Sequence, residues 1–332
     1  MGKKVFFLGA GFSKAVNSTY PLMKELTENV QKYLEKGSLA YHYDEIAPLV
    51  KEDVESLLTY LSVDFPWKRD YTKHENMALY SKIIEIISKR FEKLSECKED
   101  YDDLWLKFAK YINAHVEDYS FITLNYDVLL EQLLFKGLKQ ENDGAYEFLD
   151  DSYSYPMTYI CERDGSIFGG SLSSEKIPPI LKLHGSANWF WSGINPSDTL
   201  YYRVWKDVNE TERVLRGLKP YIIPPVMDKN AFYNHVAIRW LWEQAEKVLR
   251  EAEEIYIVGF SFPKTDLSVK YLFQSALRYS KAKIYVINVA DYQKSLKTNY
   301  EVVFGKDKVI DKYTGKPNIT KVFIKNFISS GL

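Results

Sequence analysis

The feature that most constrains the fold is a pattern that recurs along the chain, a short apolar run that ends in glycine or in a polar side chain. The first such run, Lys3 to Leu8, is β-branched and aromatic and stops at Gly9-Ala10-Gly11. Runs of this kind are typical of buried strands, and the glycines allow a sharp turn into a following helix. A strand that ends in Gly-x-Gly is common in α/β proteins of all kinds, so this motif alone does not establish a phosphate site.

Four later segments repeat the pattern. Their polar ends are Asn125 and Asp127, His184 and Ser186, Gly259 and Ser261, and Asn288. Strands that alternate with helices form a parallel sheet covered on both faces, and such sheets bind ligands along the edge formed by the carboxyl ends of the strands. We therefore predict an α/β fold, a Rossmann-like and mostly parallel sheet with helices on both faces.

The spacing of the strands predicts two insertions. The gap between the first strand and the next, Tyr119 to Leu124, far exceeds the dozen or so residues that a parallel crossover needs. Residues 22–116 carry apolar stripes at helical spacing and predict an inserted helical module. Residues 137–177, rich in Tyr, Ser, Asp and Gly, predict a loop-rich insertion. A chain of 332 residues then fits one domain, 1–332, with these insertions.

The composition argues against several classes of protein. The 44 basic and 45 acidic side chains give a net charge of −1, so no electrostatic footprint for direct nucleic-acid binding is visible. Two cysteines are too few for a disulfide framework or a four-thiolate zinc site. No signal peptide precedes the first strand, and no apolar run approaches the roughly 18–20 residues that span a bilayer. We expect a cytoplasmic protein without membrane contact.

The polar strand ends have two interpretations each. Asn125 and Asp127 precede a predicted helix, so Asp127 could simply cap it, although capping does not explain two amide or carboxylate groups at one strand end. His184 is either a structural histidine or a general base, because it stands beside Gly185 and Ser186 and imidazole titrates near pH ~6.5. The residues alone leave both alternatives open.

Two common nucleotide-site motifs are missing. The triphosphate loop Gly-x-x-x-x-Gly-Lys-Ser/Thr does not occur, which argues against an ATPase of that type. The dehydrogenase fingerprint fails because its third glycine would fall at Lys14. Hydride transfer is therefore not expected.

Four motifs taken together resemble a known family. They are Gly9-Ala10-Gly11-Phe12-Ser13, Leu124-Asn125-Tyr126-Asp127, Lys182-Leu183-His184-Gly185-Ser186, and Val258-Gly259-Phe260-Ser261 with Asp266. Their order is similar to that in the sirtuin-like domains, and within them to the bacterial NAD-hydrolysing branch found in antiphage defence. The resemblance extends from residue 3 to about residue 290.

The chain departs from the protein-deacylating sirtuins at two points. Those enzymes follow the glycine turn with Gly-Ile-Pro-Asp-Phe-Arg, where this chain has Ser18-Thr19-Tyr20-Pro21-Leu22-Met23. They also carry a four-cysteine zinc module, which two cysteines cannot build. Both departures argue against acetyl-lysine chemistry, and cleavage of NAD stays the expected reaction.

The resemblance implies an NAD+ glycohydrolase that uses NAD as substrate and needs no metal. His184 would orient or deprotonate the attacking water, Asn125 would position water and ribose, and Asp127 would bind ribose or hold the nicotinamide end. The implied NAD-binding residues are Gly9, Ala10, Gly11, Phe12, Ser13, Ser186, Gly259, Ser261 and Asn288.

Regulation also follows from the resemblance. Constant NAD hydrolysis would kill the host, as in abortive infection, so the resting enzyme should be inactive. Activation would come from homo-oligomerisation or from a separate partner, such as a ring ATPase or a nucleic-acid-guided protein. Two other functions stay open: a module that senses NAD or ADP-ribose without turnover, and a zinc-free NAD-dependent deacylase. His184 beside Asn125 favours chemistry over sensing.

Overall fold

The structure is a computed structural model, and it describes most of the chain. The described residues are 3–34, 43–44, 46–47, 53–96, 101–138, 157–160, 167–168, 177–193, 200–203, 218–227, 229, 232–263, 265–306 and 308–330.

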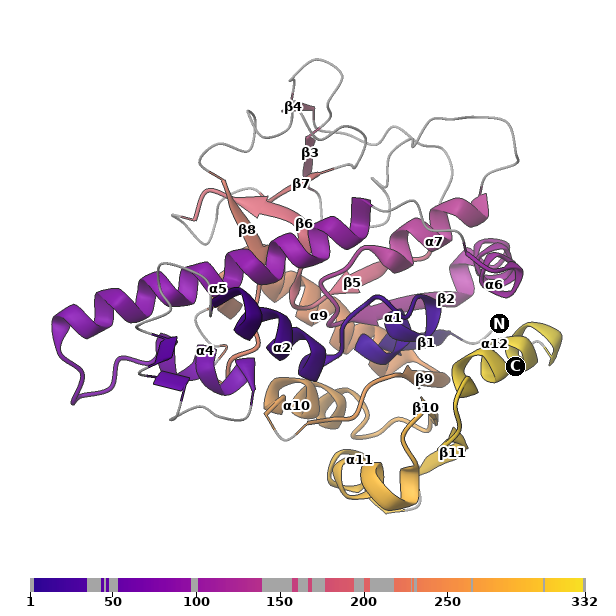
Figure 1. Cartoon of the computed structure of the whole chain (residues 1–332). Coiled ribbons are helices and arrows are strands. Elements are labelled where there is room, and N and C mark those ends of the chain that lie inside the picture. Colours follow the sequence, from indigo (N-terminus) through magenta and orange to yellow (C-terminus); the bar gives the residue numbers. More distant parts are fainter. Residues whose placement is uncertain are drawn as a thin grey trace.

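A six-stranded sheet forms the centre of the molecule (Figure 1). Its order is β11-β10-β9-β1-β2-β5, and every neighbouring pair is parallel. The strands are β1 (Lys4–Leu8), β2 (Tyr119–Thr123), β5 (Ile180–Lys182), β9 (Glu254–Val258), β10 (Lys283–Asn288) and β11 (Val309–Thr314). The predicted parallel α/β fold is confirmed. Strand β11 was not predicted from the sequence, because it is a largely half-buried edge strand without a continuous apolar run.

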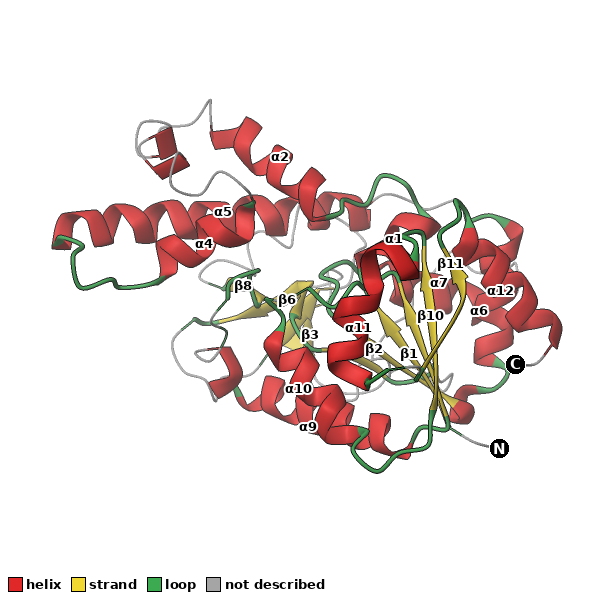
Figure 2. Ribbon diagram, turned by 90° about the horizontal axis from the view of Figure 1, so that it is seen from below, coloured by secondary structure: helices red, strands yellow, loops and turns green. Residues whose placement is uncertain are grey.

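The alternation of side chains along β1 divides the core into two layers. Val5 and Phe7 lie in one cluster of buried side chains, and Phe6 and Leu8 lie in the other. Helices α9 (Val236–Glu251), α10 (Leu267–Ala276) and α11 (Lys297–Phe304) cover the Phe7 face. Helices α6 (Asp103–Asn113), α7 (Leu129–Leu138) and α12 (Ile319–Ser330) cover the opposite face, as Figure 2 shows.

Aromatic rings pin the register of the central strands. Phe6 stands opposite both Phe121 and Tyr256, and its ring stacks on theirs at centroid distances of 5.3 and 5.0 Å. Tyr256 continues the row by stacking on Tyr285 of β10 at 5.0 Å. If one strand slipped by one residue against its neighbour, its aromatic side chain would turn to the other face of the sheet. The ring contacts therefore favour the observed register, which aligns the ends of the strands.

The helical module has a core of its own. Helices α2 (Met23–Leu34), α4 (Val54–Ser62) and α5 (Asp70–Glu96) enclose a separate apolar cluster beside the sheet (Figures 1 and 2). Its members include Val30, Leu58 and Ile83, which the periodicity of the sequence places on apolar stripes. Helix α6, at the end of the predicted 22–116 module, instead packs Trp105 and Phe108 on the main sheet.

A second, five-stranded sheet has the order β4-β3-β7-β6-β8. Its strands are β3 (Thr158–Ile160), β4 (Ile167–Phe168), β6 (Gly185–Trp191), β7 (Tyr201–Arg203) and β8 (Lys219–Ile222). The predicted loop-rich insertion, 137–177, lies for most of its length outside the described residues.

The prediction that each strand of the main sheet leads into a helix is wrong for β5. The chain turns at His184 and enters β6 directly, with Gly185 at φ +74°. A Cβ at Gly185 would lie 2.2 Å from the carbonyl oxygen of Tyr221, so a glycine is needed there. Over the described part of the chain, no helix is long and apolar enough to cross a membrane.

Candidate active site

The carboxyl ends of five neighbouring strands place the predicted residues along one edge of the main sheet. Leu8 of β1 pairs with Thr123 of β2 and with Val258 of β9, so the residues after these strands come side by side. In sheet order the edge carries Asn288, Gly259, Gly9, Asn125 and His184. This is the edge at which open parallel sheets bind ligands.

Three glycines join the β1 and β9 ends of this edge by direct backbone contact. The amides of Gly9 and Gly11 donate to the carbonyl oxygens of Val258 and Gly259 at 2.9 and 3.0 Å. Gly259 has φ +66°, and a Cβ there would lie 2.4 Å from the backbone of Gly11 and Phe12. The glycines are therefore required by the packing of the protein itself.

Beside this junction, three predicted site residues form one hydrogen-bond network. The Ser13 hydroxyl donates to Oδ2 of Asp127 at 2.8 Å. Asn125 Nδ2 donates to the Gly9 carbonyl and to the Ser13 hydroxyl, both at 3.0 Å. Helix α1 (Ala10–Val16) supplies Ser13, and the connection from β2 to α7 supplies Asn125 and Asp127.

The orientation of the Asn125 amide follows from these partners. The Gly9 carbonyl can only accept, so the NH2 group of Asn125 must face it. With both Nδ2 hydrogens donated inside the protein, Oδ1 is the atom that Asn125 has left to accept a hydrogen bond from a hydroxyl or a water.

Asp127 is buried and held from several sides. Its Oδ1 accepts a hydrogen bond from the Leu129 amide at 3.2 Å, so Asp127 also caps the start of α7. Capping was the structural interpretation of this residue in the sequence. Burial raises the pKa of its carboxyl, and the nearby Lys182 cation and the Ser13 hydroxyl lower it, with a net rise. The Asp127 carbonyl accepts from Nζ of Lys182, which also binds Glu131 Oε1 at 2.8 Å.

His184 lies at the end of β5 and is only 6% exposed. Its Nε2 is buried without a hydrogen-bond partner among the described residues. Burial, together with the positive charge of Lys229, lowers the pKa of the imidazole to about 3, and the charge of Asp266 opposes that change. The side chain is therefore a neutral imidazole at physiological pH.

Lys229 and Asp266 form an ion pair near this imidazole. Asp266 occupies the N-cap position of α10, but its side chain makes no capping hydrogen bond. Its carboxylate binds Nζ of Lys229 instead. Glu55 of the helical module accepts from Thr265 at 3.2 Å, and burial together with the charge of Asp266 raises the pKa of its carboxyl.

The sequence motifs include Lys182 and Asp266 but assign no role to the charge of either, and Lys229 and Glu55 lie outside the motifs. Lys182 is the one that a pattern could have revealed, as a lysine inside an otherwise apolar strand. Nothing local distinguishes Lys229 or Glu55, because their neighbours come from distant segments.

The remaining predicted residues lie along the same edge in different settings. Ser186 is fully buried, and its hydroxyl donates to the Tyr126 carbonyl at 3.3 Å. Asn288 donates to the Phe260 carbonyl and accepts from the Ala290 amide, so its amide shapes a turn. Phe12 packs against Trp105 in the core, whereas Ala10 and Ser261 are exposed.

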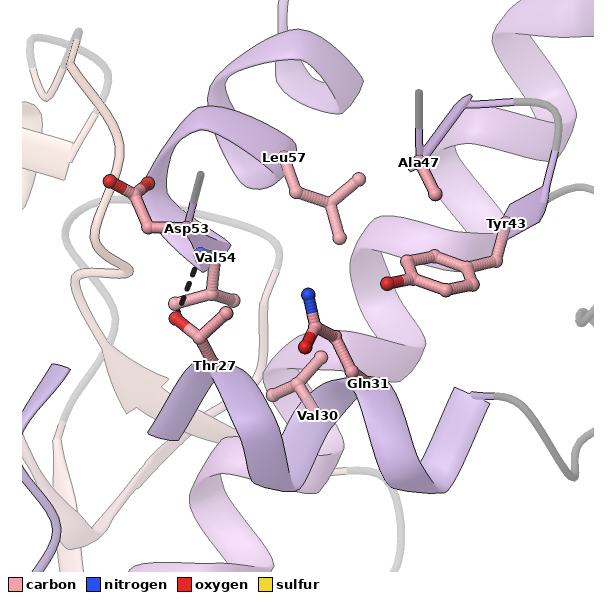
Figure 3. A pocket seen from close by; sticks show the side chains of 8 residues that line it. All are labelled: Thr27, Val30, Gln31, Tyr43, Ala47, Asp53, Val54 and Leu57. Atoms are coloured by element: carbon pink, nitrogen blue, oxygen red, sulfur yellow. Dashed lines mark hydrogen bonds between the residues drawn. The ribbon is translucent and has the colours of Figure 1, made fainter. Parts of the chain in front are cut away.

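A cavity of about 160 Å³ lies elsewhere, within the helical module (Figure 3). The side chains around it, labelled in that view, come from α2, from α4 and from the segment between them. One wall is closed by a hydrogen bond of 3.1 Å from the Val54 amide to the Thr27 hydroxyl. None of the predicted site residues lines this cavity, so it is separate from the strand ends.

The polar groups at the strand ends are amides, hydroxyls and backbone groups, with one carboxylate and one imidazole. Within the described ranges, no group of three or more His, Cys, Asp or Glu side chains could hold a metal ion. Such donors suit the hydroxyls of a ribose better than a metal or an apolar ligand.

The parallel sheet and its polar carboxyl edge define a Rossmann-like α/β protein, a class in which ligands bind at the strand ends. The SIR2-like domain family matches residues 119–307, more than half of the chain. The chain belongs to that family. A comparison with curated proteins finds no match.

Solved structures with a related arrangement include sirtuins. A complex of a Sir2 homologue with NAD has 11% identity and a TM-score of 0.48, over 99% of this chain and 90% of that one. A structure that addresses the structural basis of sirtuin substrate affinity has 12% identity and a TM-score of 0.46, over 99% of this chain and 94% of that one. A mutant Sir2 homologue bound to ADP-ribose gives the same four values as the latter.

Proposed function

We propose that this SIR2-like protein is an NAD+ glycohydrolase, which cleaves the nicotinamide–ribose bond to nicotinamide and ADP-ribose. The observation that carries the proposal is the network of Ser13, Asn125 and Asp127 at the strand ends, next in sheet order to the buried His184. Nε2 of that imidazole has no hydrogen-bond partner among the described residues. A buried polar atom without a partner is costly to maintain, so Nε2 of His184 is available to a water or to a ligand hydroxyl.

The chemistry asked of the site is modest. Nicotinamide leaves as a neutral molecule from a cationic ribosyl-pyridinium, so its departure needs no general acid. The C–N bond breaks with its electron pair on the nicotinamide nitrogen, and water adds to the anomeric carbon. The site must hold the ribose, stabilise the positive charge of the transition state and accept one proton from the water.

His184 would orient the attacking water or take up its proton. The pKa of its imidazole is lowered to about 3, so the ring is neutral across the physiological range and Nε2 can accept a hydrogen bond from the water, while the low pKa makes the ring a weak base before a ligand binds. The proton would pass to Nε2 directly or through a ribose hydroxyl, and from there to solvent.

Asn125 and Asp127 fit the tasks of positioning and charge stabilisation. Oδ1 of Asn125 would accept from the attacking water or a ribose hydroxyl, since its Nδ2 is committed to Gly9 and Ser13. Asp127 would hold the ribose or the nicotinamide end. When ionised, its carboxylate also favours a cationic transition state.

The glycine turns would hold the rest of the dinucleotide. The amides of Gly9 and Gly11 are used inside the protein, so a pyrophosphate would approach this turn, residues 9–13, at exposed Ala10. Gly259 and Ser261 would lie on the adenosine side, with Asn288 at the adenine ribose and Ser186 as support beneath the His184 turn.

The experiment is NAD consumption by the purified protein, with nicotinamide and ADP-ribose separated by chromatography. His184→Ala and Asn125→Ala should each lose at least a hundredfold in turnover. The matched control is His115→Ala, an exposed histidine on the connection before β2, which should keep full turnover. Wild-type turnover in both site variants would refute the assigned roles.

A sensing role has one observation in its favour. The donors of Ser13 and Asn125 are already used inside the protein, as in a site that binds a ligand without turnover or waits for activation. Calorimetry separates the functions: NAD binding without hydrolysis supports a sensor or a silent enzyme, and the absence of binding refutes both. Release of an acyl-ADP-ribose from an acylated peptide would instead identify a zinc-free deacylase.

For the cell we propose a regulated NAD-depleting effector of antiphage defence, cytoplasmic and silent at rest. A homo-oligomer, or a separate ring ATPase or nucleic-acid-guided protein, would switch it on. Size-exclusion chromatography that gives a lone monomer before and after activation would remove the oligomer from this scheme.

A further inference from the structure

Lys182 is a fully buried cation at the end of β5, two residues before His184. Its Nζ reaches across to the neighbouring connection, where it donates to the Asp127 carbonyl and to Glu131 Oε1, the latter at 2.8 Å. Lys182 therefore joins the backbone that carries Asn125 and Asp127 to the strand from which His184 emerges.

The contacts of Asp127 show how completely this connection is fixed. Its carbonyl binds Lys182, one carboxylate oxygen binds the Ser13 hydroxyl, and the other binds the Leu129 amide. The first of these is the contact that comes from the His184 strand. Glu131, fully buried in the first turn of α7, supplies the opposite charge.

Stability alone is a poor reason for such a pair. Replacing a buried ion pair by apolar side chains of similar size is often neutral or stabilising, because the charges no longer have to be stripped of water. What apolar side chains cannot supply is the donor to the Asp127 carbonyl. The pair is therefore better explained by the geometry that it imposes on the site.

We propose that Lys182 is a positioning residue of the NAD site, with Glu131 as its counter-ion, and that its ammonium group sets the offset between the Asn125–Asp127 connection and His184. The inference rests on the proposed function. It also places a positive charge beside the Asp127 carboxyl, where it opposes protonation of that group.

The decisive variant is the double replacement Lys182→Met with Glu131→Leu, which removes both charges and keeps the volume. The measurements are the thermal unfolding midpoint and the affinity for ADP-ribose by calorimetry, which does not depend on turnover. The double variant should unfold within a few degrees of the wild type and bind ADP-ribose at least tenfold more weakly. As the pH is lowered, the affinity should also begin to decline at a higher pH than in the wild type, because Lys182 lowers the pKa of the Asp127 carboxyl more than Glu131 raises it.

Lys68→Met is the matched control. Lys68 also donates to backbone carbonyls, those of Tyr60 and Val63, at 2.5 and 2.7 Å, but it lies in the helical module, between α4 and α5. It should lose stability and keep ADP-ribose affinity. A folded double variant with wild-type affinity and pH profile would overturn the role of Lys182 while leaving the function intact. Wild-type protein that binds neither NAD nor ADP-ribose would overturn the function, and this inference with it.

Discussion

The hydroxyl of Ser13 donates a 2.8 Å hydrogen bond to the carboxylate of Asp127, although 114 residues separate them. The long connection between β1 and β2 accounts for this separation in sequence. The two strands pair side by side in parallel, so the residues that follow them lie close together. Both side chains are buried, so the bond forms where water does not compete.

Ser13→Ala should weaken both the fold and the site. It removes the donor to Asp127 and the acceptor for Asn125, and the buried carboxylate is left short of one partner, a loss of about 1–3 kcal/mol. Urea unfolding measures the stability, and NAD turnover or ADP-ribose affinity measures the site.

Ser95→Ala is the matched control for this variant. Both serines are 2% exposed, but Ser95 donates to the Phe91 carbonyl within α5. It should lose stability only. If the two variants affected ligand binding equally, the Ser13–Asp127 bond would have no special part in the site.

Gly259→Ala should abolish the site through backbone geometry. The new Cβ would lie 2.4 Å from the backbone of Gly11 and Phe12, so the β1 and β9 ends would be forced apart. Gly305→Ala provides the comparison, since φ there is also positive, +86°, but the nearest atom is 3.9 Å away. Strain alone should cost Gly305→Ala about 1–3 kcal/mol and leave ligand binding intact.

The measurements for this pair are circular dichroism and calorimetry with ADP-ribose. A Gly259→Ala protein that binds as well as Gly305→Ala would show that the close backbone contact is dispensable.

Acid should destabilise the fold through His184. Burial and the charge of Lys229 lower the pKa of its imidazole to about 3, while the unfolded chain titrates near pH ~6.5. Between these two pH values, His184 therefore binds a proton in the unfolded chain but not in the folded protein. The contribution of His184 to stability is complete above about pH 6.5 and declines as the pH falls towards 3.

His184→Gln should remove that loss. Between pH 7 and pH 4.5, its stability should fall by about 2 kcal/mol less than that of the wild type, measured by urea unfolding at both pH values. His115→Gln, at an exposed site, should behave as the wild type does. An identical acid response of wild type and His184→Gln would contradict a neutral buried imidazole.

The activity profile gives a separate test of the same group. Because the imidazole stays neutral down to about pH 3, NAD turnover should show no decline near pH 6.5. The wild-type rate between pH 5 and 8, measured with a mixed buffer, checks this. A titration near 6.5 that His184→Gln abolishes would show that the ring is protonated far more easily than its burial implies.

Tyr126→Phe should loosen the connection that carries Asn125. The Tyr126 hydroxyl donates to the Ile223 carbonyl at 2.6 Å, and both groups are buried. Removing it leaves that carbonyl without this donor and should cost about 1–2 kcal/mol. Urea unfolding gives the loss, and turnover should fall because Asn125 shifts with the connection. Unchanged stability would mean that water replaces the hydroxyl.

Several elements could be predicted from local signals. The runs that became β1, β2, β9 and β10 are short and apolar with breakers at their ends, and such signals act within a few residues. The stripe through Ile83 and Ile87 likewise predicted part of α5. Neither β11 nor most of the second sheet could be found in this way, because their strands are short or half-buried and depend on distant partners.

The site divides in the same way. Local sequence signals predict which residues end the strands, because turn chemistry and apolar runs act within a few residues. These residues are Gly9, Asn125, His184, Gly259 and Asn288. Three contacts at the site depend on the folded chain: Ser13 binds Asp127, Lys182 binds both the Asp127 carbonyl and Glu131, and Lys229 pairs with Asp266 near His184. Burial and charge pairing depend on what the rest of the chain brings to each side chain, and no local pattern encodes that.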